Sequence, residues 1–488
     1  MTEADLKLAE NRKLWGLAEV IAFAWPAIIS MLNGTIMMFV DGMMVSQFDS
    51  ALAGQFTGGM IIFVLQSFGL GVLAIIDTFV SQNFGAGRGN KCGLYAWNAL
   101  YLALIFSAAV QILHIFNNDI FSLITKDAVV QQKASLYASF MICNTLFFLA
   151  ARVLEHFFFG IGKSKIVLVA SIIANVCNVV ANYVLIFGKL GFPEMGLKGA
   201  AIGTVFSSGV LMTTMLVFFL RKKYRIKFGT SNYKCFSKTI AKEIIKVGLP
   251  AGTQFCSDMA TWALFSTVLV GQFGKIALTA NTVVVRYLSL SFMPAVGLSI
   301  AATALVGRYI GLGRKDIARK RARASLLLAL LYMGICGTLF LVFREHLMRF
   351  YLEAITQFQH AGAEKKLSGL EMTQVVETGT GLFFMVALFQ LFDAMAISYS
   401  GALKGTGDTL WPMIVSAIVS WGVMVGLGVL FLYLFPGLGP KAPWLAAAVD
   451  IMILGMLFCW RFESGKWEKI DLLKQPVEPE MLDTELEV

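Results

Sequence analysis

Three aspartates interrupt long apolar stretches of this chain, and their type and position are suited to ion chemistry. Asp41 follows NGTIMMFV, Asp258 lies in GTQFCSDMATW and Asp393 lies in ALFQLFDAMA. A carboxylate at the centre of a bilayer costs roughly 2.5–3.5 kcal/mol on insertion scales, so each acid needs an explanation. Each alone could be a helix-end residue that faces water. Together they indicate carboxylates that hold a proton, a sodium ion or a cationic substrate in exchange for one another, as antiport requires.

Side-chain amides accompany the first of these acids. Asn175, Asn178 and Asn182 recur at spacings of three and four, so their amides share one face of a helix. Their oxygens could complete the shell of a hard cation beside Asp41. They could equally serve as hydrogen bonds between helices, and the sequence leaves both interpretations open.

Two further residues stand out inside apolar stretches. Arg286 carries a permanent charge that needs a carboxylate or water nearby, and we expect it to pair with Asp258 or Asp393. Pro26 removes a backbone donor ahead of Asn33-Gly34, so the helix can bend near Asp41 and act as a gate, or it can simply be kinked.

Several chemistries are excluded by missing motifs. The chain has no G-x-x-x-x-G-K-[ST] motif for ATP phosphates and no H-E-x-x-H metalloenzyme motif. Its seven cysteines include no C-x-x-C pair, so a disulfide framework or zinc site is not expected. We therefore expect no enzyme activity and no cofactor, and an ion gradient must supply the energy.

The composition is that of a membrane protein. Of the 488 residues, 57% are hydrophobic and 14% are charged, whereas soluble proteins carry roughly 25% charged residues. Apolar runs bounded by charges, Gly or Pro predict twelve membrane-spanning helices in an all-α fold. Their expected ranges are 16–44, 54–80, 94–116, 134–160, 166–188, 199–220, 245–271, 278–306, 324–343, 374–400, 412–435 and 443–460.

The chain also repeats itself, which predicts two halves. WPA at 25–27 recurs as LPA at 249–251, SQNFGAGR at 81–88 as GRYIGLGR at 307–314, and GIGKS at 160–164 as GTGDT at 405–409. Six spans per half make the halves parallel, as in many transporters. The number of residues between a motif and its repeat increases along the chain, and a longer external loop at 344–372 accounts for this increase. The expected organisation is a tail at 1–15, an N-lobe at 16–220, a basic linker at 221–244, a C-lobe at 245–460 and a tail at 461–488.

The positions of Lys and Arg predict the orientation. Most of them lie in segments that share one side of the membrane if both termini are cytoplasmic, above all in 221–246 and 308–323. Positive residues are enriched in cytoplasmic loops, so both ends are expected inside. We therefore attribute the net charge of +10 to the loops that orient the protein in the membrane, and we expect no nucleic-acid partner.

At this point the motifs resemble a known family. Pro26 with FVDGMMVSQ, VSQNFGAGR, NVVANYVLIFG followed by MGLKGAAIGT, and FMPAVGLSIAATALVGRYIGLGR together resemble the multidrug and toxic compound extrusion (MATE) family, over about residues 14–460. The resemblance implies two six-helix lobes around a central cavity that opens alternately to either side. It also implies export of organic cations and other amphipathic compounds against Na⁺ or H⁺, from the bacterial inner membrane, by a protein expected to be monomeric.

The resemblance also assigns roles to residues. In the N-lobe, it implies a coupling site at Asp41 with Asn178, Asn182 and Thr204 around it. In the C-lobe, the acids of the NorM-like branch match Asp258 and Asp393, and Phe389 stands where some members have a tyrosine. A sodium ion could bind at Asp41 or at Asp258 and Asp393. Arg286 departs from the family, which usually has a small polar residue there.

Two other functions remain as alternatives. A flippase for a lipid-linked saccharide shares the twelve-span architecture, but it would need several basic residues in its cavity, whereas this chain offers mainly acids. A membrane enzyme acting on lipid would need a nucleophile with a base, or a metal cluster, and no histidine lies near another candidate.

Overall fold

The computed structural model is all α-helical in the part of the chain that it describes, which is residues 13–45, 47–48, 51–124, 127–231, 236–358 and 369–473. The first half contains α2 (Lys13–Val45), α3 (Ala51–Ala74), α4 (Ile76–Gly85), α5 (Gly89–Gln111), α6 (Leu113–Ile124), α7 (Ala128–Gly160), α8 (Ser164–Ile186), α9 (Leu197–Phe219) and α10 (Lys222–Phe228). The second half contains α11 (Lys238–Leu264), η1 (Phe265–Val270), η2 (Gly271–Phe273), α12 (Gly274–Gly311), α13 (Lys315–Val342), α14 (Arg344–Phe358), α15 (Gly369–Thr406), α16 (Leu410–Val419), η3 (Ser420–Leu427), α17 (Gly428–Leu434), η4 (Pro436–Leu438), α18 (Lys441–Glu463) and η5 (Lys466–Lys469).

Eleven helical stretches are long and apolar enough to cross a membrane, among the residues described. One of them, Lys238–Gly311, is 74 residues long and contains both α11 and α12, which are joined at η2. Gly274 adopts a positive φ of 82° at this junction, a conformation that glycine takes without strain. Each of the twelve predicted spans therefore lies on a long helix or on consecutive helices, which confirms the all-α membrane fold.

The helices extend beyond the predicted apolar spans. The fourth span was expected at 134–160, but α7 begins at Ala128, where the Asp127 side chain accepts hydrogen bonds from two backbone N–H groups and caps the helix. The expected loop at 344–372 is a larger difference. Its first fifteen residues form α14, and 359–368 lie outside the described residues. Met348 and Leu352, four residues apart, are buried on one face of this helix, which explains how a polar stretch is helical.

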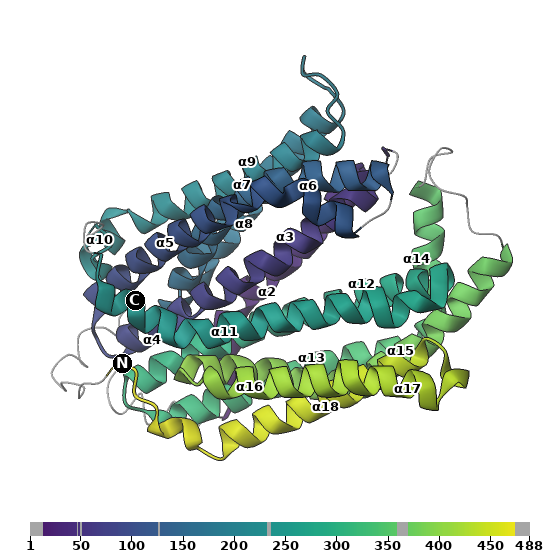
Figure 1. The fold of residues 1–488 in the computed structure, drawn as a ribbon. Helices are drawn as coiled ribbons and strands as arrows, with labels where there is room; N and C mark the ends of the chain where they lie inside the picture. Colours follow the sequence, from purple (N-terminus) through teal and green to yellow (C-terminus); the bar gives the residue numbers. More distant parts are fainter. Residues whose placement is uncertain are drawn as a thin grey trace.

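The helices form two bundles that diverge, as Figure 1 shows. We call them the N-bundle (α2 to α10) and the C-bundle (α11 to α18). The bundles come together at the end of the molecule where α2 begins and α18 ends, here called the terminal end, and they separate toward α6 and α14, here called the distal end (Figure 1). At their contact, α11 packs against α3, and α12 packs against α2 and α4.

Glycines allow the two bundles to approach closely near the terminal end. A Cβ atom added at Gly71 of α3 would lie 2.7 Å from Cα of Gly252 in α11. One added at Gly297 of α12 would lie 2.8 Å from Cα of Ile28 in α2. The residues of α3 nearer the distal end, such as Gly58, instead approach α7 of the same bundle. Small residues of this kind bring helix backbones together in membranes, where no hydrophobic force drives association.

We expect Gly71→Ala to destabilise the protein, because the added methyl group meets backbone atoms that cannot rotate away. The expected cost is about 1–3 kcal/mol. Gly209→Ala is a matched control, since nothing lies within 4 Å of a Cβ there and alanine favours the helix. Thermal unfolding of the purified protein in detergent measures both, and equal melting temperatures for the two variants would contradict the close contact.

Candidate functional site

The first candidate site lies along the contact between α2 and α8. The two helices run parallel and are joined by polar contacts at three levels. Ser30 Oγ donates to Ser171 Oγ at 3.2 Å, Asn175 Nδ2 donates to the Asn33 carbonyl at 3.0 Å, and Asn182 Nδ2 donates to Asp41 Oδ1 at 2.6 Å. Two of the three asparagines on α8, Asn175 and Asn182, thus direct their amides toward α2.

A chain of polar groups leads from Asp41 into the N-bundle. Asn182 Nδ2 also donates to Asn178 Oδ1 at 3.0 Å, and Asn178 Nδ2 donates to Ser207 Oγ of α9 at 3.0 Å. Asn178 and Asn182 are buried, whereas Asp41 is half-buried. Thr204, one turn before Ser207, donates to the backbone and interacts with the Tyr137 hydroxyl of α7. The structure thus brings Asp41, Asn178 and Asn182 together and places Thr204 beside them.

This arrangement is suited to a small cation. The Asp41 carboxylate receives one amide donor, which is little compensation for a charge away from bulk water. The Oδ1 atom of Asn182 is buried and has no hydrogen-bond partner. Rotation of this amide would turn its oxygen toward Asp41, and carboxylate and amide oxygens are the ligands of hard cations. Protonation of Asp41 would relieve the same deficit.

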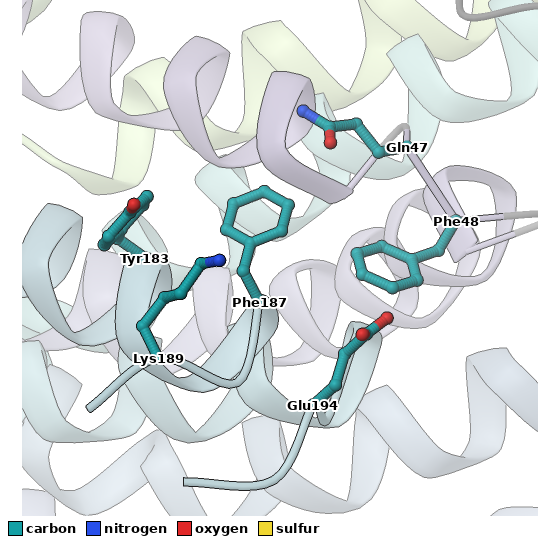
Figure 2. A pocket seen from close by; sticks show the side chains of 6 residues that line it. All are labelled: Gln47, Phe48, Tyr183, Phe187, Lys189 and Glu194. Carbon is teal, nitrogen blue, oxygen red and sulfur yellow. The ribbon is translucent and has the colours of Figure 1, made fainter. Parts of the chain in front are cut away.

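A surface hollow of about 580 Å³ lies one to two turns beyond this site, toward the distal end. Figure 2 shows the six side chains that line it, Gln47, Phe48, Tyr183, Phe187, Lys189 and Glu194. Tyr183 directly follows Asn182 in α8, and the other five residues lie in the segments that follow α2 and α8, so the hollow adjoins the ends of these two helices. Its lining carries one acid and one base, and we assign no substrate to it.

Pro26 is buried in α2, and the helix continues through it from Lys13 to Val45. The structure therefore shows a continuous helix in this conformation, and bending at Pro26 stays a prediction.

The two acids of the C-bundle are separate from each other. Asp258 on α11 interacts electrostatically with Lys404 of α15 and with Asp450 of α18. Asp393 on α15 is 9% exposed, and in the described part of the chain its carboxylate forms no hydrogen bond or ion pair. The single C-bundle site expected from the sequence is thus two separate carboxylates, each with its own surroundings.

Arg286 does not pair with either acid among the described residues. Its guanidinium instead interacts with the Tyr351 hydroxyl of α14. The adjacent Tyr287 hydroxyl donates to the Leu347 carbonyl of the same helix at 3.1 Å. Arg286 faces the distal end because α14 packs there, so the expected pairing is corrected to a contact that fastens α14 to α12.

Phe389 is fully buried, and its ring stacks on Trp444 with centroids 6.5 Å apart. It belongs to the core of the C-bundle in this conformation. The sequence did not single out Lys404, because it lies beyond the apolar run that predicted the tenth span. Helix α15 continues to Thr406, so Lys404 lies half-buried in its last turn, where its backbone carbonyl accepts a hydrogen bond from Thr78 of α4.

Comparison with known proteins identifies the family. A family model described as MatE matches residues 26–184 and 256–430, which is more than half of the chain. The chain belongs to the MATE family. It is 27% identical over 457 residues to a probable multidrug resistance protein NorM from Thermotoga maritima, covering 92% of this chain and 93% of that protein. It is also 27% identical over 468 residues to the multidrug resistance protein MdtK from Yersinia enterocolitica, covering 94% and 96%.

Solved structures show the same fold. A MOP superfamily transporter from Pyrococcus furiosus superposes with a TM-score of 0.80 at 18% identity, covering 93% of this chain and 97% of that chain. A structure described as the outward-facing conformation of a multidrug resistance MATE family transporter gives the same TM-score, identity and coverage. The MATE fold is therefore shown for this chain, as the sequence motifs predicted.

We expect Arg286→Gln to loosen α14 without altering the rest of the C-bundle, because it removes the contact of the guanidinium with Tyr351. The loss of one such hydrogen bond is worth about 1–3 kcal/mol locally. Hydrogen–deuterium exchange should become faster in 344–358, and Tyr351→Phe should have a similar effect. Faster exchange around Asp258 with an unchanged α14 would instead favour the pairing expected from the sequence.

Proposed function

We propose that this MATE family protein is a cation-coupled antiporter, driven by Na⁺ or H⁺, that exports organic cations, drugs or other toxic amphipathic compounds. Relatives that match over nearly the whole chain carry the names multidrug resistance protein NorM and MdtK. The contact between Asp41 and Asn182 is the observation that carries the proposal, because it joins two membrane helices through an incompletely compensated carboxylate.

The mechanism we infer is competition for buried acids. A coupling ion that binds Asp41 completes the oxygen shell started by Asn178 and Asn182. Release of that ion restores a negative charge that attracts a cationic substrate. Asp258 and Asp393 supply further negative charge in the C-bundle. The divergence of the two bundles supports alternating access, with the substrate held between an N-lobe at 16–220 and a C-lobe at 245–460 (Figure 1).

We further propose that both termini face the cytoplasm of a bacterium, with the protein in the inner membrane. Basic residues gather at the terminal end. Burial lowers the pKa of Lys163, between α7 and α8, and the nearby charges of Lys223, Lys227, Arg308 and Lys165 lower it further. Such a positive cluster is typical of the cytoplasmic side.

The orientation is tested by labelling with a membrane-impermeant thiol reagent. Lys222→Cys on α10 and Glu353→Cys on α14 place exposed thiols at opposite ends of a protein whose native cysteines have been replaced. In right-side-out vesicles we expect labelling at position 353 only, and in inside-out vesicles at position 222 only. The reverse pattern would contradict the proposed topology.

Transport itself is tested with ethidium. Expression should lower its accumulation in cells, and purified protein in liposomes should move it when a Na⁺ or pH gradient is imposed. Asp41→Asn removes the charge that binds the coupling ion, so we expect ion-driven transport to fall to near the level of empty liposomes. Asp119→Asn on α6 removes an exposed acid and serves as the control.

Two results of the ethidium experiment would contradict the proposal. Transport by Asp41→Asn with unchanged ion dependence would remove Asp41 from the mechanism. Absence of ethidium movement by the unaltered protein, together with movement of a fluorescent lipid-linked saccharide, would favour the flippase alternative.

A further inference from the structure

Helix α10 lies at the terminal end of the molecule, against the N-bundle (Figure 1). Its sequence is KKYRIKF, and its two aromatic residues, Tyr224 and Phe228, are buried. The centroid of the Tyr224 ring lies 5.6 Å from that of the Phe158 ring in α7. The centroid of the Phe228 ring lies 5.9 Å from that of the Phe84 ring in α4. These contacts hold one side of α10 against the bundle, so its other side chains face outward.

The outward side of α10 is basic and carries one apolar side chain. Lys222, Lys223 and Arg225 are exposed, and Ile226 is 71% exposed. Helix α10 follows directly after α9, one of the helices that are long enough and apolar enough to cross the membrane. Basic side chains and an exposed apolar residue beside a membrane span are typical of the membrane interface, where cations meet lipid headgroups.

A basic residue of the C-bundle lies next to this surface. Cζ of Arg308 in α12 is 5.2 Å from the centroid of the Phe84 ring, and Nζ of Lys227 in α10 is 5.9 Å from the same centroid. A Cβ added at Gly85 would meet the Arg308 carbonyl oxygen, so the backbones of α4 and α12 touch here. One phenylalanine ring is therefore contacted by two cations, one from each bundle, at the place where the bundles touch.

Arg308 is half-buried, and its guanidinium forms no ion pair or hydrogen bond within the described ranges of the chain. A further cation, Lys163, lies close to α10, because its backbone N–H donates at 2.8 Å to the carbonyl of Phe158, the residue that contacts this helix. The strongest charge effects on Lys163 come from Lys223, Lys227 and Arg308. Like charges repel one another, so an anion bound among them would stabilise the arrangement.

We propose that this surface binds the headgroup of an anionic phospholipid, and that Lys227 of the N-bundle and Arg308 of the C-bundle both contact the same headgroup. Guanidinium and ammonium groups are the usual donors to phosphate oxygens. The exposed Ile226 and the adjacent membrane span favour a lipid over a soluble phosphate, because they place the cations at the membrane surface. The bound lipid stabilises the contact between the bundles at the terminal end. The inference goes beyond the proposed antiport and requires neither a coupling ion nor a transported substrate.

The test is a titration of the purified protein in a neutral detergent with dioctanoyl phosphatidylglycerol, followed by the melting temperature. Dioctanoyl phosphatidylcholine supplies the same acyl chains without a net charge, and inorganic phosphate supplies the anion without the chains. We expect the melting temperature to rise with phosphatidylglycerol alone. An equal rise with phosphatidylcholine would show a site for any lipid, and an equal rise with phosphate would show a site for soluble anions. Either result would overturn the inference.

Variants assign the binding to the two cations. Arg308→Gln and Lys227→Gln each remove one charge, so the half-saturating concentration of phosphatidylglycerol should rise about fivefold in each. Arg308→Lys keeps the charge and should stay close to the unaltered protein, and Lys227→Gln remains informative if Arg308→Gln folds poorly. Lys320→Gln removes an exposed charge of α13 at the same end and is the matched control. An unchanged value in either glutamine variant, or an equal rise in the control, would contradict binding by this pair.

Hydrogen–deuterium exchange tests whether the lipid joins the two bundles. In the unaltered protein, phosphatidylglycerol should slow exchange both in 222–228 of α10 and in 308–314 at the end of α12. In Arg308→Gln it should slow exchange in 222–228 only. Protection of 222–228 alone in the unaltered protein would show a lipid bound to one bundle and would refute the shared headgroup. These measurements report binding, so a failure of ethidium transport would count against the proposed function and leave this test intact.

Discussion

The cost of a charge inside an apolar medium constrains the whole structure. Each buried acid must find a donor, a cation or a proton, and the three acids of the proposed mechanism meet this requirement differently. Asp41 has one amide donor from α8, Asp258 interacts electrostatically with Lys404 of α15 but forms no ion pair with it, and Asp393 has no partner in the described residues. The differences are useful, because a carboxylate that is fully satisfied would have no reason to bind an ion.

The same constraint explains how the two bundles meet. Polar side chains are expensive where lipid or the partner bundle lies close, so the contact near the terminal end is made by glycines, by backbone carbonyls and by a few hydroxyl and amide donors from α4. Apart from the ion pair between Glu19 of α2 and Arg321 of α13, this contact carries little charge. Its close glycine contacts and neutral hydrogen bonds can be broken and remade without leaving an ion in the hydrocarbon layer.

Much of the fold was predictable because its signal is local. Apolar runs gave all twelve spans, but their ends were missed where helices continue into polar sequence, as α7 does from its Asp127 cap. The segment at 344–372 was misread as a loop because it is polar overall, although Met348 and Leu352 at a spacing of four were the signal for α14. The pairing of Asp41 with Asn182 followed from helical spacing and family resemblance together.

The partners of single charges were not predictable in the same way. Which face of α12 carries Arg286, and how far α15 extends past its apolar run to include Lys404, depend on packing between distant segments. A sequence shows that a charge needs a partner, but several candidates satisfied that need equally. The structure assigns Tyr351 to the arginine.

Helix α2 is held at two levels by different halves of the molecule. Near its start, Glu19 forms an ion pair with Arg321 of α13 and accepts a hydrogen bond from the Tyr309 hydroxyl, both in the C-bundle. From Phe23 to Asp41 it is joined to α8 of the N-bundle, beginning with the hydrogen bond from Ser164 Oγ to the Phe23 carbonyl at 3.1 Å. Any swing of one bundle against the other must therefore deform α2 between Glu19 and Phe23, or one of the two sets of contacts must break. Pro26 lacks the N–H that would bond to the Ala22 carbonyl, so the backbone of α2 is weakened within that short segment.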